Sequence, residues 1–115
     1  MDKILEVTLL YDFYGELLGE KQRDIFEMHY QNDLSLAEIG EILGVSRQAV
    51  FDQLKRAEKA LSEYEGKLAL VEKFRAAREK LRELKETVGS LEKKGVFGPE
   101  LSNIRKKAVE LEDLL

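Results

Sequence analysis

Hydrophobic side chains recur along this chain at steps of three and four residues, and no segment alternates apolar and polar positions. Steps of three and four place side chains on one face of an α-helix, whereas a β-strand requires steps of two. A first apolar stripe covers residues 4–18 and ends at Gly19. A second covers residues 21–31 and ends at a turn formed by Asn32 and Asp33. We therefore predict an all-α protein that begins with two helices.

Residues 35–61 have the local features of a helix-turn-helix. Ser35 and Glu38 form a Ser-x-x-Glu capping box, which satisfies the free amides at the start of a helix. Gly44 is suited to the left-handed residue that ends this helix, and Ser46 to the cap of a second one. We predict two helices joined by this short turn, which is the motif whose second helix most often enters a DNA groove.

The apolar stripe continues beyond this motif without proline. It runs in alternate steps of four and three from Val50 to Val71, and a second stripe, shifted by one residue, runs from Leu70 to Leu91. Such spacing is typical of a coiled-coil seam. Pro99 suits the first position of a last helix. That helix, roughly 24 Å long, is too short to cover the seam, so we predict burial by a second copy of the chain.

The predicted dimerisation residues share the apolar face of the last two helical segments. They are Leu70, Phe74, Ala77, Leu81, Leu84, Val88, Leu91, Leu101, Ile104, Ala108 and Leu111. The pattern leaves open whether the last helix packs on its own chain or on its neighbour. In either arrangement we expect a homodimer.

Composition limits the number of domains and the compartment. A chain of 115 residues, 43% of them hydrophobic, can bury one modest core. We predict a helix-turn-helix head at residues 1–65, followed by a helical dimerisation extension at residues 66–115. There is no cysteine, no secretory signal pattern, and no apolar run near the roughly 20 residues that span a bilayer. We therefore expect a cytoplasmic protein with no membrane partner.

Charge is unevenly distributed. The formal net charge of −4 disfavours a nucleic-acid-binding domain when only the total is considered. However, residues 1–43 hold three Lys or Arg against ten Asp or Glu, whereas residues 66–94 hold nine against five. One face can therefore meet a polyanion while another meets a basic partner.

The second helix of the motif carries the candidate nucleic-acid-binding residues. With Val50 at the centre of the buried stripe, the helical repeat turns the other side outward. The candidates on that side are Arg47, Gln48, Lys55, Arg56 and Lys59. Arginine and glutamine can read base edges, whereas lysine more simply meets phosphate. It is equally consistent with the sequence that this side is an ordinary solvated helix face, because Asp52 and the acidic residues 1–43 repel a polyanion. Phe51 lies on the flank of the buried stripe and could stack on a base, but we expect it to pack against the second helix of the chain, in the core.

The basic segment 73–85 has two interpretations. Its cations could hold the phosphates of structured RNA by shape. Glutamates interleave with them at helical spacing, as on the exposed flanks of a coiled coil, and we favour this second interpretation.

The sequence contains no constellation for catalysis. No serine has a histidine at motif spacing, and no glycine-rich phosphate loop follows a strand. The sole histidine, His29, has no second imidazole or cysteine with which to hold a metal. We predict a non-enzyme with no catalytic residue, metal or cofactor.

Two resemblances narrow the function. Residues 18–61 resemble region 4 of bacterial sigma factors, a four-helix head that reads promoter DNA. The first 75 or so residues are more similar to the YlxM family, through residues 10–14, 45–52 and 63–68. Membership in this family would imply a cytoplasmic bacterial regulatory protein of the signal recognition particle pathway that binds nucleic acid.

Three functions remain open at this point. One is a regulator that uses the head on RNA of the signal recognition particle or on the protein of that particle. Another is a DNA-binding transcription regulator. The third is a helical protein-interaction and dimerisation module that binds no nucleic acid.

Overall fold

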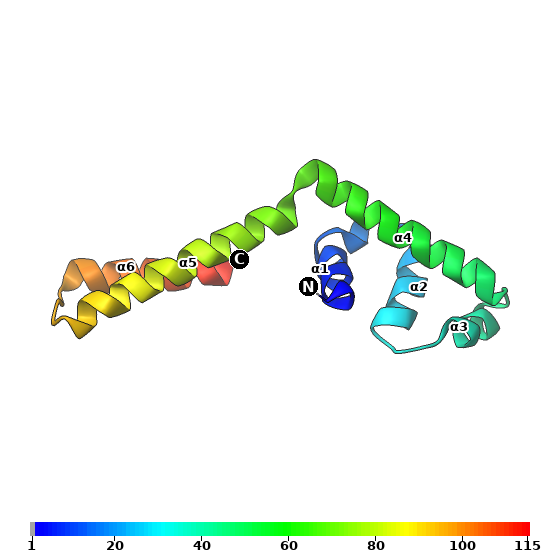
Figure 1. Ribbon diagram of the computed structural model, residues 1–115, viewed down its shortest axis with the longest axis horizontal. Helices are drawn as coiled ribbons and strands as arrows, with labels where there is room; N and C mark the ends of the chain where they lie inside the picture. The colour runs from blue at the N-terminus through cyan, green and yellow to red at the C-terminus, as the bar shows by residue number, and fades with distance from the viewer. Residues whose placement is uncertain (1) are drawn as a thin grey trace. The chain divides into compact units, whose positions relative to one another are not determined.

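The computed structural model describes residues 2–115, and these form helices joined by short turns (Figure 1). In chain order they are α1 (Lys3–Tyr14), the short 3₁₀ turn η1 (Gly15–Leu17), α2 (Glu20–Tyr30), α3 (Leu36–Leu43), α4 (Arg47–Leu68), α5 (Leu70–Lys93) and α6 (Pro99–Leu114). The described part of the chain contains no strand. The prediction of an all-α fold is confirmed.

The chain divides into two compact units, of which the first ends at Val71 and the second begins at Glu72. In the first unit, α1, α2 and α3 each pack against α4. The apolar stripes of these helices meet in one core, which consists of Val7, Leu10, Tyr14, Leu18, Ile25, Phe26, Ile39, Val50, Leu54, Ala57, Leu61 and Val71. The helix α4 is thus the central support of the head, with one face buried along most of its length.

The helix-turn-helix is formed by α3, α4 and the turn between them, as predicted. The Ser35 hydroxyl accepts a hydrogen bond from the Glu38 amide at 3.1 Å, and the Glu38 carboxylate accepts one from the Ser35 amide at 3.0 Å. Gly44 ends α3 in the left-handed conformation, with φ of 71°. The Ser46 hydroxyl then caps α4 by accepting the Ala49 amide hydrogen at 3.0 Å.

The junction between α4 and α5 is not formed by a glycine. Gly66 lies inside α4, and the chain turns at Ala69, which ends the helix with a left-handed φ of 53°. A non-glycine residue in this region carries a steric cost. Other contacts must therefore hold the turn.

Those contacts come from α1 and from the last turns of α4. The Tyr14 hydroxyl donates to Glu65 Oε1 at 2.6 Å and accepts from the Leu70 amide at 3.0 Å. Glu65 Oε1 also accepts from the Val71 amide at 3.0 Å. These bonds satisfy amides at the start of α5, which would otherwise be orphaned, and anchor its first residues in the head. Burial, followed by the hydrogen bond to Glu65, raises the pKa of Tyr14.

The second unit is a helical hairpin in which α6 packs back along α5 of the same chain (Figure 1). Leu81 and Val88 of α5 and Ala108 of α6 are buried. Ion pairs join the helices, between Lys85 and Glu112 at 3.0 Å and between Arg105 and Glu92. In this structure the last helix packs on α5 of its own chain.

No helix in residues 2–115 combines the length and the apolar character needed to cross a lipid bilayer.

Candidate nucleic-acid interface

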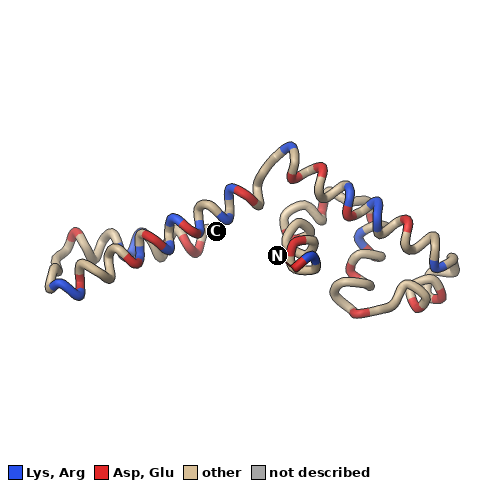
Figure 2. Tube along the Cα trace, in the orientation of Figure 1, with Lys and Arg blue, Asp and Glu red and all other residues tan. Residues whose placement is uncertain are grey.

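The outward face of α4 is the place where the helix-turn-helix presents side chains to solvent. Val50, Leu54, Ala57 and Leu61 bury the opposite face in the core. Figure 2 shows Lys and Arg positions along α4. The structure exposes each residue of the predicted set, which comprises Arg47, Gln48, Lys55, Arg56 and Lys59. One rigid helix therefore carries all of them.

Gln48 is oriented by the next turn of its own helix. Its side-chain amide donates to Asp52 Oδ1 at 3.0 Å. The carbonyl oxygen and the second amide hydrogen of Gln48 are left for a ligand, and these are the groups that pair with adenine in a major groove. Asp52 itself places a carboxylate in the middle of the basic stripe, which weakens the attraction for phosphate.

Sequence reasoning missed a nearly buried carboxylate beside the stripe, that of Glu58. Its side chain is 11% exposed and lies between two lysines, with Lys55 Nζ at 3.8 Å and Lys3 Nζ at 3.7 Å. The pair of Lys55 and Glu58 could be expected from their spacing of three residues on α4. The pair of Lys3 and Glu58 could not, because Lys3 belongs to α1. Burial and the neighbouring Glu58 carboxylate raise the pKa of Tyr30 to about 12.

The exposure of Phe51 differs from the prediction. The expectation that it packs in the core is wrong, because 37% of it is exposed. The ring of Phe26 in α2 packs instead against Tyr11 and Tyr30, whose ring centroids lie 4.3 Å and 4.6 Å from its own. Phe51 lies outside this cluster, with Lys55 Nζ 5.4 Å from its ring centroid. An aromatic ring therefore belongs to the exposed stripe.

The surface that adjoins α4 on the N-terminal side of the motif is acidic. None of residues 24–46 is Lys or Arg. Asp33, Glu38 and Glu41 are exposed there, and Ser35 lowers the pKa of Glu38 by hydrogen bonding. The positive charge of the motif is consequently confined to α4.

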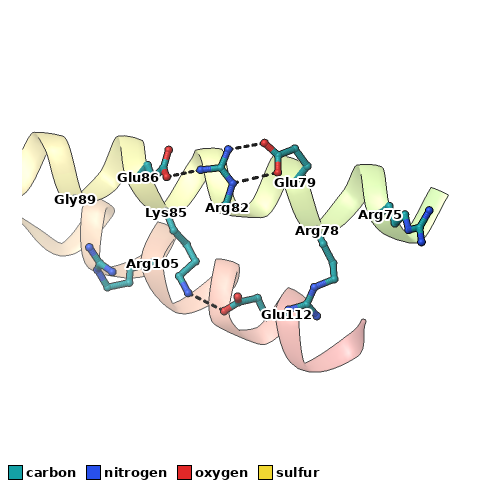
Figure 3. A pocket seen from close by; sticks show the side chains of 9 residues that line it. All are labelled: Arg75, Arg78, Glu79, Arg82, Lys85, Glu86, Gly89, Arg105 and Glu112. Atoms are coloured by element: carbon teal, nitrogen blue, oxygen red, sulfur yellow. Dashed lines mark hydrogen bonds and ion pairs between the residues drawn. The ribbon is translucent and has the colours of Figure 1, made fainter. Parts of the chain in front are cut away.

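In the second unit, the basic segment lines a groove between α5 and α6 (Figure 3). Arg82 binds both Glu79 and Glu86 from its own helix, and these bonds raise its pKa and lower that of Glu79. Lys85 is paired with Glu112 across the groove. These pairings match the exposed flanks of a helical hairpin, the interpretation that the sequence analysis favoured.

Comparison with known proteins agrees with this architecture. A family model described as "Putative helix-turn-helix protein, YlxM / p13 like" matches residues 1–95. The chain is 58% identical to a UPF0122 protein of Caldanaerobacter subterraneus over 76% of this chain and 74% of that protein. It is 47% identical to a UPF0122 protein of Thermoanaerobacter sp. over 98% and 97%, respectively.

A UPF0122 protein of Shouchella clausii is 49% identical over 78% of this chain and 83% of its own length. The family is described by its helix-turn-helix and not by an enzymatic activity. The helix-turn-helix built by α3 and α4 and the matches over most of the sequence lead to one conclusion: this chain belongs to the UPF0122 family of YlxM/p13-like helix-turn-helix proteins.

Proposed function

We propose that this chain is a nucleic-acid-binding regulatory protein of the bacterial signal recognition particle pathway, and that it binds through α4. The observation that carries the binding proposal is the exposed stripe of Arg47, Gln48, Lys55, Arg56 and Lys59 on one rigid helix. Among the residues that the structure describes, Arg56 and Lys59 form no ion pair, so their charge is available to phosphate. The assignment to the pathway rests on the resemblance to the YlxM family.

Direct binding tests the proposal. Labelled RNA of the signal recognition particle and a labelled DNA duplex of random sequence are each titrated with the protein near physiological salt, and fluorescence anisotropy is measured. The triple variant Lys55→Ala, Arg56→Ala, Lys59→Ala should bind more weakly. The slope of log affinity against log salt should fall by roughly two to three, since each lost phosphate contact contributes about 0.7 to 0.9.

The matched control removes three exposed lysines from the second unit instead, Lys93, Lys106 and Lys107. This variant should bind like the wild type. An unchanged affinity in the α4 variant would contradict binding through α4. A selection from random duplexes that enriches one sequence would favour the transcription-regulator alternative over the particle.

We also propose that the chain is a homodimer joined through its second unit. Leu84, Ile104 and Leu111 of the predicted seam remain exposed on the hairpin. A groove between α5 and α6 is lined by Leu81, Leu84, Leu111, Leu114, Leu115, Ala77 and the stem of Lys80. α5 has 24 residues and α6 has 16, so about 12 Å of α5 extends beyond its partner.

A second copy fits this surface because a two-fold axis brings identical apolar strips together. The expected result is a dimer mass by sedimentation at micromolar concentration. A monomer mass under these conditions would overturn this proposal and leave the one on nucleic acid intact.

A further inference from the structure

The exposed ring of Phe51 gives the α4 surface a feature that phosphate binding does not use. Phe51 is 37% exposed and lies one helical turn from both Gln48 and Lys55, at the edge of the stripe that faces solvent. Every nucleobase has a flat face, and stacking on an aromatic side chain contributes about 1–3 kcal/mol per base. In an intact duplex both faces of an internal base are already covered by its neighbours. The ring is therefore of most use to an unpaired base.

The cations of α4 are arranged for one strand. Lys55 Nζ lies over the Phe51 ring, 5.4 Å from its centroid. A base that stacks on this face would displace the ammonium group, which would stay close enough to pair with the phosphate of the same nucleotide. Lys59 lies about one turn, or roughly 6 Å, further along the helix, and Arg56, the residue after Lys55, lies beside this pair, rotated by about 100° from Lys55. The three cations span only about 6 Å of the helix axis, so one phosphate backbone can reach all of them.

The surroundings of α4 oppose a duplex. When a helix-turn-helix docks in a major groove, its first helix crosses the phosphate backbone. Here that helix is α3, whose Glu38 and Glu41 are exposed, and none of residues 24–46 carries a lysine or arginine. Phosphates of a duplex docked in this way would meet like charge without compensation.

We infer that the ligand of α4 is an unpaired segment of nucleic acid, one base of which stacks on Phe51 while its phosphates follow Lys55, Arg56 and Lys59. This inference rests on the proposed nucleic-acid-binding function and names the form of nucleic acid that the head takes. Gln48, held by Asp52, then meets the edge of a base next to the stacked one.

The test compares three labelled probes at one salt concentration by fluorescence anisotropy. They are a single-stranded RNA and a single-stranded DNA of about 12 nucleotides each, a length within the usual site sizes, and a blunt DNA duplex of the same sequence. Both single strands should bind more tightly than the duplex. The difference between the RNA and DNA arms shows whether the sugar also contributes.

Variants of the ring test the stacking directly. Phe51→Leu should lower the affinity for the single strands on the order of tenfold, within the range expected for one lost stacking contact. Phe51→Tyr keeps a ring and should stay close to the wild type. The matched control is Phe97→Leu, since Phe97 is also an exposed phenylalanine, 74% exposed, but lies in the second unit. That control should bind like the wild type.

Circular dichroism of each variant shows whether the helices are intact, and the comparison of probes on the wild type requires no variant. A duplex bound as tightly as the single strands would overturn the inference and leave the proposed function standing. So would an unchanged single-strand affinity in a folded Phe51→Leu protein. Failure of the wild type to bind any of these three probes would overturn the inference, whereas failure to bind the particle RNA and the random duplex as well would overturn the proposed function.

Discussion

Glu58 lowers the contribution of Lys55 to the binding of a polyanion at the proposed interface. Its Oε2 has no hydrogen-bond partner among the described residues, and the carboxylate forms ion pairs with Lys3 and Lys55. The charge of Lys55 is therefore partly compensated by a carboxylate on its own helix. Arg56 and Lys59 lack such compensation and should each contribute more than Lys55 to the attraction for a polyanion.

Tyr30, which shares this environment, gives a prediction about alkaline pH. Its pKa is raised to about 12 by burial and by Glu58, from about 10 in an unfolded chain. A raised pKa means that folding favours the protonated phenol. The resulting stabilisation is complete below about pH 10 and is lost as the pH rises through 12. Urea unfolding at a series of alkaline pH values should show this loss, and Tyr30→Phe should make it less steep.

Tyr64→Phe serves as the control, because the Tyr64 hydroxyl makes only a long contact of 3.4 Å with the Leu17 carbonyl. An alkaline slope that is identical in Tyr30→Phe and in the wild type would show that Tyr30 is not responsible.

Among the elements, α3 depends on a close approach to the turn that follows it. A Cβ atom at Gly40 would lie 2.7 Å from the Val45 carbonyl oxygen, which is backbone and cannot move aside cheaply. Gly40→Ala should therefore destabilise the head by about 1–3 kcal/mol through overpacking. Chemical unfolding followed by circular dichroism measures this.

Gly66→Ala is the matched control within α4. No atom lies within 4 Å of the Cβ position at Gly66, so alanine should stabilise the helix by up to about 1 kcal/mol. If Gly40→Ala changed the free energy of unfolding no more than Gly66→Ala does, the close approach of α3 to the turn would not be required for stability.

At the same scale, the sequence predicted the helix starts better than the end of α4. Ser35 with Glu38, and Ser46 with Ala49, act within three residues, so their caps could be read from the sequence. The end of α4 depends on Tyr14, which lies 51 residues before its partner Glu65. A contact over that separation leaves no local pattern, so the turn at Ala69 could not be foreseen.

For the molecule as a whole, the proposed dimer bears on the strength of binding. One α4 surface offers a small number of cations, and its affinity should be weak and sensitive to salt. A dimer carries two heads, and where both engage one strand, avidity raises the overall affinity without a new contact.

The second unit provides the test of this assembly. Leu111→Glu with Leu114→Glu places two charges on exposed apolar positions of α6, which are 47% and 82% exposed. The hairpin should tolerate them, whereas an apolar interface should not, so sedimentation should show a monomer. Leu17→Glu, at a position 55% exposed in the head, is the control and should remain a dimer. An unchanged mass in the double variant would place the interface elsewhere.

The sequence by itself determined the helices, the helix-turn-helix corner and the outward direction of Arg56 and Lys59. Each of these follows from helical periodicity or from caps that act within one turn. The tertiary structure alone decided the exposure of Phe51, the pairing of Lys3 with Glu58 and the anchoring of α5 by Tyr14. These features depend on which surfaces meet when residues distant in the chain pack together, and the spacing along one helix does not encode that choice.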